Sequence, residues 1–166
     1  MAGNYATRQP VDVVGIGMDR LAAVDEIMAA AFDPRYGEAW NSAQVLATLA
    51  MPGYQLRGAY LGDGAGQLAG FAIFRIIAGE SELLLLAVHP RWRRSGVATA
   101  LMNDWLSICS GELVTMACLE MREDNPARDL YRAFGFVEVA LRKSYYRGND
   151  GTMRNAVTMN KMVTAF

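Results

Sequence analysis

The feature that most constrains the fold is an apolar run at residues 83–88, which is followed at once by His89-Pro90. Every position in this run is apolar, so it lacks the alternation of a half-exposed strand, and its length suits a strand covered on both faces. Beyond the proline, apolar residues recur at the spacing of one helix face, namely Val97, Leu101, Trp105 and Ile108. The stretch therefore predicts a buried strand, a tight turn and an amphipathic helix.

The first turn of that helix is expected to hold Arg93, Arg94, Ser95, Gly96 and Ala98. Backbone N–H groups in a first helical turn have no partner within the helix, and the helix dipole favours negative charge there. Gly96 has no side chain to keep a ligand away, and the arginines would add charge-assisted hydrogen bonds. The pattern indicates a pyrophosphate site, although an ordinary turn with solvated arginines fits the spacing equally well. Neither a P-loop nor a Gly-x-Gly-x-x-Gly fingerprint can be placed here, so nucleoside triphosphate and NAD sites are excluded.

Composition bounds the class of protein. With 166 residues and 52% apolar content, the chain is expected to form one domain over residues 1–166, with a loose tail at 1–9. Sixteen basic and 17 acidic residues give a net charge of −1, which predicts no general attraction to nucleic acid. No segment has the pattern of a signal peptide or a membrane span, so a cytoplasmic location without a membrane partner is expected. One histidine and two cysteines predict neither a metal site nor a disulfide framework.

The remaining pattern predicts an α/β fold, a mixed sheet of about seven strands flanked by about four helices. Asp19 is expected to cap a helix at 21–31, and Asn41 with Gln44 to form the capping box of a second helix. Asn125-Pro126 should begin a short helix that Gly135 closes. The expected strands are 11–16, 54–61, 68–77, 83–88, 113–119, 136–146 and 153–163, with turns at 62–66 and 148–151 and with 113–119 parallel to 83–88.

Arg93-x-x-Gly96-x-Ala98 after an apolar strand resembles the signature of the GNAT superfamily, the acyl-CoA-dependent N-acetyltransferases. The order of elements resembles that superfamily over the whole chain. The motifs after residue 119 are similar to those of the bacterial ribosomal-protein alanine N-acetyltransferase family. These motifs are Leu119-Glu120-Met121-Arg122, Asn125, Leu130-Tyr131, Gly135-Phe136, Arg142 to Tyr146 and Asp150-Gly151. Arg93 stands where Gln is more usual, Ala98 replaces a second Gly, and Ala39-Trp40-Asn41 replaces Pro-Trp-Ser/Thr.

The resemblance implies acetyl-CoA as cosubstrate, without a metal, and a role for each matching residue. Glu120 would be the general base and Tyr131 the general acid. The residues that would hold the cofactor are Leu86, Ala87 and Val88 through the backbone, Arg93, Arg94, Ser95, Gly96, Val97, Ala98 and Thr99 around the pyrophosphate, and Asn125.

For each of these residues the sequence also allows a purely structural role. Glu120 ends an apolar strand, which should raise its pKa and make it a better base, but Arg122 on the same face would oppose that shift or simply pair with it. Tyr131 also fits a core aromatic, and Asn125 a helix cap. Cys118 is a candidate nucleophile for a covalent route, but no histidine is near it. His89 fits a turn residue better than a catalytic one.

The acceptor is the least constrained part of the prediction. An α-amino group has a pKa of about 7.7–8.0 against about 10.4 for lysine, so a single base suffices for an α-amine. Tyr145-Tyr146 with the turn at 148–151 would form one wall of a peptide groove and residues 35–40 the other. We therefore expect acetylation of a protein N-terminus beginning with alanine, that of a small-subunit ribosomal protein. The alternatives are a small-molecule amine as acceptor and an acyl-CoA sensor without catalysis.

Overall fold

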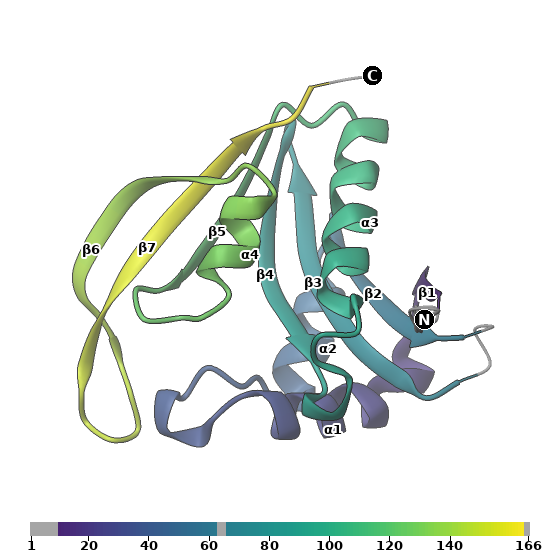
Figure 1. The fold of residues 1–166 in the computed structure, drawn as a ribbon, viewed down its shortest axis with the longest axis horizontal. Coiled ribbons are helices and arrows are strands. Elements are labelled where there is room, and N and C mark those ends of the chain that lie inside the picture. The colour runs from purple at the N-terminus through teal and green to yellow at the C-terminus, as the bar shows by residue number, and fades with distance from the viewer. Residues whose placement is uncertain (1–9, 63–65, 165–166) are drawn as a thin grey trace, which may run out of the picture.

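The computed structural model describes residues 10–62 and 66–164, which form a seven-stranded mixed sheet with helices on both faces (Figure 1). The strand order is β1-β2-β3-β4-β5-β7-β6, and every neighbouring pair is antiparallel except β4 and β5. This confirms the predicted fold class and the parallel pair. The strands are β1 Val11–Gly15, β2 Tyr54–Leu61, β3 Leu68–Ile77, β4 Glu80–Val88, β5 Met116–Arg122, β6 Val137–Arg147 and β7 Met153–Met162. The helices are α1 Leu21–Ala31, α2 Ser42–Leu49, α3 Val97–Gly111 and α4 Arg128–Ala133, with 3-10 turns at Met18–Arg20, Pro34–Tyr36 and Pro90–Trp92.

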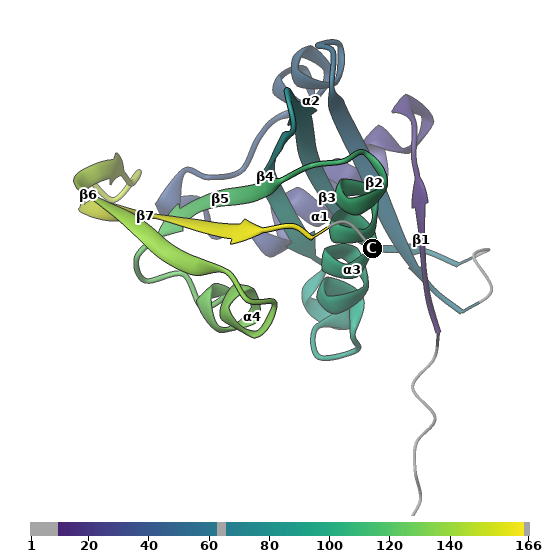
Figure 2. The same cartoon turned by 90° about the horizontal axis from the view of Figure 1, so that it is seen from above.

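Two apolar cores lie on opposite faces of the sheet, as the view from above shows (Figure 2). One core packs α1 and α2 against β2, β3 and β4. The other packs α3 and α4 against the sheet and centres on Trp105, which is fully buried beside Phe74 and Phe136. The indole N–H of Trp105 donates a hydrogen bond to Ser81 Oγ at 2.8 Å, so its polar atom is satisfied. The predicted apolar stripe of α3 is thus the face that contacts the sheet.

Strands β4 and β5 pair over only part of their length. Their register runs from Glu80 opposite Met116 to Leu83 opposite Leu119 and then stops. At this point β4 carries a bulge, because Phe74 of β3 faces Leu83 while Ile73 faces Leu85. Beyond the bulge β4 continues to Val88 beside β3, and β5 continues to Arg122 beside β7, so the two strands diverge (Figure 1).

The divergence explains why β4 is less covered than its sequence predicted. The side chains of Leu83, Leu85 and Ala87 are buried, whereas those of Leu84 and Leu86 are only half-buried. An apolar run was expected to be covered on both faces. Here Leu84 and Leu86 pack partly against opposite cores, and both border the opening between β4 and β5, which leaves them partly uncovered.

Several predicted boundaries were wrong for local reasons. Asp19 lies inside a 3-10 turn, and Arg20 precedes α1 without a side-chain cap. β5 begins at Met116 instead of 113, because Leu113 adopts a left-handed φ of 57° after α3 and its side chain is 73% exposed. The predicted first turn of α3 was also misplaced, since the helix begins at Val97.

Other local predictions are confirmed. Asn41 and Gln44 form the expected capping box, in which each side chain accepts the other's backbone N–H at 2.9 Å. Gly135 closes α4 with a φ of 84°. α4 itself begins at Arg128, later than predicted. The expected tail at 1–9 and positions 63–65 of the first hairpin turn lie outside the described residues.

Candidate active site

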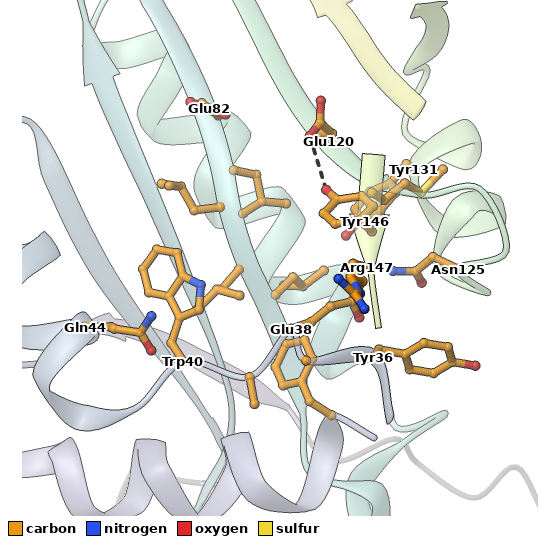
Figure 3. A pocket seen from close by; sticks show the side chains of 18 residues that line it. Tyr36, Glu38, Trp40, Gln44, Glu82, Glu120, Asn125, Tyr131, Tyr146 and Arg147 are labelled. Atoms are coloured by element: carbon orange, nitrogen blue, oxygen red, sulfur yellow. Dashed lines mark hydrogen bonds between the residues drawn. The ribbon is translucent and has the colours of Figure 1, made fainter. Parts of the chain in front are cut away.

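A cavity of about 420 Å³ lies where β4 and β5 diverge (Figure 3). Four residues predicted for the site line it, namely Leu86 of β4, Glu120 of β5, Tyr131 of α4 and Asn125, which precedes α4. These residues are far apart in the sequence and meet only because the crossover through α3 makes β4 and β5 neighbours. Glu82 also lines the cavity, and Arg75 pairs with its carboxylate at 2.7 Å.

Glu120 has three polar partners at one end of the cavity. Its carboxylate accepts a hydrogen bond from the hydroxyl group of Tyr146 at 3.2 Å (Figure 3). It also accepts one from the hydroxyl group of Thr158 at 3.4 Å and pairs with the guanidinium of Arg142. The Arg142 side chain is 50% exposed, so this pair is open to solvent on one side. The carboxylate is therefore held in the cavity by groups on β6 and β7.

The cation beside Glu120 is not the one predicted. Arg122 was expected to oppose or pair with Glu120, but its guanidinium instead contacts the carboxylates of Glu38 and Asp124. Arg142 reaches Glu120 because β6 carries extra residues between Arg142 and Tyr146 relative to β7. Within this bulge Ser144 has a φ of 50°, and its N–H donates to the side chain of Asn155 at 2.9 Å. No sequence pattern predicted this irregularity.

Tyr131 lies on the inner face of α4 and is buried beside Phe136. Burial, with a smaller contribution from the negative charge of Glu38, raises the pKa of Tyr131 to about 12. The phenol therefore stays protonated at neutral pH. A buried protonated hydroxyl that borders the cavity is a proton donor in chemical terms.

Asn125 was predicted to be the N-cap of this helix, but the N-cap of α4 is Ala127, which has no side-chain cap. The Asn125 side-chain oxygen instead accepts the N–H of Ala127 at 2.9 Å, in a turn before the helix. This leaves the side-chain amide group as a donor on the cavity lining. The turn contact and a ligand contact are thus compatible for one residue.

Of the predicted pyrophosphate residues, 93–96 form a turn after β4 and 97–99 begin α3, and all lie outside the cavity lining. Gly96 is the N-cap of α3 with a φ of 89°, and a Cβ atom built there would meet no atom within 4 Å. Residues 93–96 form a turn, and the N–H groups of Val97, Ala98 and Thr99 in the first turn of α3 have no acceptor earlier in that helix. Open space beside N–H groups at a helix start fits an anionic group.

The path from the cavity to this turn follows β4. Ala87 and Val88 pair with β3 on one side and lie past the last β4–β5 pair on the other. Gly70 lets this region pack closely, because a Cβ atom there would lie 2.7 Å from the Ala87 carbonyl oxygen and 2.8 Å from Val97. Arg93 donates to the carbonyl of Ala31 at 3.3 Å, which ties the turn to the end of α1.

The two predicted walls of the acceptor groove both contribute to the cavity. Tyr36 to Trp40 line it from the α1–α2 loop, and Tyr146 and Arg147 line it from β6. The turn at 148–151 does not line the cavity but binds the loop: Asn149 donates its backbone N–H to Arg35 O at 2.8 Å and its side-chain amide to Pro34 O at 2.7 Å. Glu38, which no sequence pattern singled out, enters the cavity with this loop.

Two further candidates occupy structural positions. His89 Nδ1 accepts the N–H of Arg91 at 3.2 Å in the turn after β4. Burial raises the pKa of the Cys118 thiol, and the charges of Glu82 and Glu80 raise it further, so the neutral thiol is favoured. In residues 10–62 and 66–164, no cluster of three His, Cys, Asp or Glu side chains is placed to hold a metal ion. No helix in the same ranges is long and apolar enough to cross a membrane.

Comparison with known proteins identifies the family. A model for an acetyltransferase (GNAT) domain matches residues 56–138. The ribosomal protein bS18-alanine N-acetyltransferase of Haemophilus influenzae is 37% identical over 93 residues, which are 56% of this chain and 64% of that protein. The chain thus spans less than two thirds of the length of this curated relative, whose name confirms the resemblance predicted from the sequence.

Solved structures confirm the fold. The ribosomal-protein-S18-alanine N-acetyltransferase from Escherichia coli superposes with a TM-score of 0.82 at 24% identity, over 95% of this chain and 96% of that one. Arabidopsis thaliana NAA60 in complex with acetyl-CoA superposes with a TM-score of 0.78 at 20% identity, over 93% and 99%. Since the family model covers half of the sequence and the fold agrees throughout, the chain belongs to the GNAT acetyltransferase family.

Proposed function

We propose that this chain transfers an acetyl group from acetyl-CoA to the α-amine of a protein N-terminus beginning with alanine. One observation carries the proposal: the divergence of β4 and β5 brings a carboxylate, Glu120, and a protonated phenol, Tyr131, into one cavity. From the cavity, β4 leads to the turn at Gly96, where α3 begins. Membership of the GNAT family and the name of the H. influenzae relative support the same reaction.

In the proposed reaction, Glu120 accepts a proton from the acceptor ammonium group. The neutral amine nitrogen then attacks the carbonyl carbon of the thioester and forms the C–N bond. As the C–S bond breaks, Tyr131 donates its proton to the sulfur, so CoA leaves as a thiol. The new amide nitrogen releases its second proton, which restores the Tyr131 phenol through solvent, and Glu120 returns its proton to solvent. The pKa of Tyr131, raised to about 12, keeps the phenol protonated at neutral pH and makes it a weaker acid, so its proton moves only as the sulfur becomes negative.

The cofactor would lie along β4. In this arrangement the backbone of Leu86, Ala87 and Val88 binds the pantetheine arm as an added strand would. The pyrophosphate is held by the N–H groups of the turn, with Asn125 contacting the cofactor near Tyr131. The turn residues are Arg93, Arg94, Ser95, Gly96, Val97, Ala98 and Thr99. Transfer is direct within a ternary complex, because the Cys118 thiol is held in its neutral form.

A ribosomal protein as acceptor follows from the names of the relatives and from the cavity. The α1–α2 loop and β6 bound the cavity on its acceptor side, where an extended peptide with a small first residue would fit. Such an acceptor would place the reaction in the cytoplasm. A small-molecule amine is the second candidate, since the same two residues would serve it.

The test is acetyl-CoA turnover with peptides identical except for the first residue, beside a matched set with a blocked α-amine and a free lysine. We expect the alanine peptide to react fastest and the blocked set to be inert. Equal rates on the blocked set, or faster turnover of a small amine than of any peptide, would assign the enzyme to another acceptor class. Mass spectrometry after mixing with acetyl-CoA alone should find no acetyl group on Cys118.

A further inference from the structure

Glu38 is a second carboxylate in the cavity, and the proposed reaction does not use it. It lies in the loop between α1 and α2, and its side chain is 21% exposed on the cavity lining (Figure 3). One oxygen, Oε1, accepts the Nε–H of Arg122 at 2.6 Å. Among the described residues this is its only hydrogen bond, so most of the accepting capacity of the carboxylate is free.

Arg122 fixes the position of Glu38. Its side chain is 5% exposed, and a buried guanidinium needs charged and polar partners to offset its desolvation. Asp124 provides one of these partners, and the ring of Tyr36 lies 3.3 Å from the guanidinium carbon. The arginine therefore joins β5 to the loop that carries Glu38.

The hairpin between β6 and β7 fixes the same loop from the other side. Asn149 donates two hydrogen bonds to carbonyl groups of the loop, one to Pro34 and one to Arg35. Arg154 of β7 also lies over the Tyr36 ring, at 4.8 Å from its centroid. An anchored loop can hold a charge in a defined place, which a mobile loop cannot.

The charge of Glu38 acts on the cavity itself. It contributes to the raised pKa of both Tyr131 and Tyr146, after burial, so both hydroxyl groups lie within its field. The charge of the other carboxylate, Glu120, is balanced by its ion pair with Arg142. Glu38 and Asp124 share the charge of Arg122, and Arg147 of β6 also lines this side of the cavity, so Glu38 contributes a fixed carboxylate with unused acceptor sites.

We propose that Glu38 binds the ammonium group of the acceptor as it enters, and so selects a cationic amine before Glu120 removes the proton. This inference rests on the proposed function. An ammonium group has three N–H donors and a positive charge, which match a carboxylate with one oxygen still free. Glu38 would act on acceptor binding and leave the chemical step to Glu120 and Tyr131.

The alternative is that Glu38 serves only as the counter-ion of Arg122. Glu38→Gln separates the two roles, because glutamine keeps the size and an oxygen for the Arg122 N–H but has no charge. The measurement is calorimetric binding of two peptides in the presence of CoA: one begins with alanine, and the other has a hydroxyl group in place of its α-amine. The wild type should bind the amine about 10-fold or more tightly than the hydroxyl peptide, as a charged hydrogen bond implies.

In Glu38→Gln we expect this preference to vanish and the KM for the alanine peptide to rise about 10-fold. The kcat and the KM for acetyl-CoA should stay within about threefold of the wild-type values. The reason is that the lost contact stabilises the bound acceptor and the transition state equally. Glu38→Asp keeps the negative charge on a side chain that is shorter by one methylene group. This variant should keep part of the preference for the amine peptide. Asp124→Asn is the matched control, since Asp124 also pairs with Arg122 but does not line the cavity.

The outcomes separate the proposals. A preference that persists in Glu38→Gln, that is absent from the wild type, or that is lost equally in Asp124→Asn would overturn the role of Glu38. If Glu38→Gln fails to fold, Glu38→Asp supplies the comparison, and a wild type without the preference still overturns the role. Failure of the proposed function has another pattern, a wild type that acetylates no N-terminal peptide.

Discussion

The proposed cofactor side and the proposed acceptor side of the site are built in different ways. The proposed cofactor side consists of β4, the turn at Gly96 and α3, a continuous stretch of chain that would bind through backbone donors. The acceptor side is assembled from the α1–α2 loop, the end of β5 and the β6–β7 hairpin. Its contacts join Glu38 to Arg122 and Pro34 to Asn149, which are 84 and 115 residues apart. One side is a local structure, whereas the other depends on pairs of side chains that only the complete fold brings together.

This difference predicts how each side fails. A backbone site is damaged when a side chain is added to it, and the damage concerns cofactor binding. A side-chain network is damaged when a group is removed, and the damage concerns the acceptor or the rate. The substitutions below test that division in order of expected effect.

The largest effect is expected for Gly96→Glu. A carboxylate would fill the open space beside the free N–H groups, and a non-glycine residue at a φ of 89° adds backbone strain. Acetyl-CoA affinity should fall by about 10³-fold, which is about 4 kcal/mol. Titration calorimetry with acetyl-CoA measures this affinity in the wild type and in the variant.

Gly79→Glu provides the matched control for this change. Gly79 has a similar φ of 81° and open space around it, but it lies in the turn before β4. The Gly79→Glu substitution imposes the same backbone strain but places its carboxylate away from the turn at Gly96. Equal loss of affinity in both variants would mean that strain, not occupation of an anion site, explains the result.

Glu120→Gln is expected to lower kcat by about 10²-fold or more, because the variant cannot take the ammonium proton. Acetyl-CoA affinity should be nearly unchanged, since the cofactor side does not depend on this carboxylate. Steady-state kinetics with the alanine peptide provides the test. Glu138→Gln, which removes a carboxylate paired with Arg128 and Arg132 at the surface, should keep the wild-type rate. A Glu120→Gln enzyme with full turnover would remove the base from the mechanism.

Tyr131→Phe should change how stability depends on pH. The folded-state pKa of Tyr131, about 12, lies above its ordinary value of 10.0, so the folded state keeps a proton that the unfolded chain loses. Stability from this group is complete below pH 10 and is lost as pH rises from about 10 to 12, by at most about 1.4 kcal/mol per pH unit. Urea unfolding at pH 9 to 11 should show a shallower decline in the variant. A decline as steep as in the wild type would mean that Tyr131 ionises normally.

The smallest effect is expected for Asn149→Ala on the acceptor side. The variant loses the side-chain hydrogen bond to Pro34 but keeps the backbone bond to Arg35. Loosening the loop by one hydrogen bond should raise the KM for the peptide by about three- to tenfold and leave acetyl-CoA binding alone. Peptide and cofactor KM values from the same kinetic series distinguish the two sides. An increase in the acetyl-CoA KM of equal size would show that the sides are coupled.

Sequence reasoning succeeded where neighbours in the chain decide the structure. The Asn41 capping box, the Gly135 helix end and the apolar stripe of α3 each depend on residues within a few turns of one another. It was wrong where a left-handed residue ended an element, as at Leu113, because leucine has no intrinsic preference for that conformation. It was also wrong about the partner of Arg122.

What the sequence by itself determined is the order of the elements, the strand–turn–helix unit at residues 80–111 and the identity of Glu120 and Tyr131 as site candidates. Apolar periodicity and glycine positions encode the elements locally, whereas Glu120 and Tyr131 were singled out by the resemblance to the GNAT superfamily. Only the tertiary structure decided that β4 and β5 diverge, that Arg142 rather than Arg122 meets Glu120, and that Glu38 enters the cavity. These features follow from strand register and from charge pairs between distant segments, and pairing at long range has no periodic signal in a single sequence.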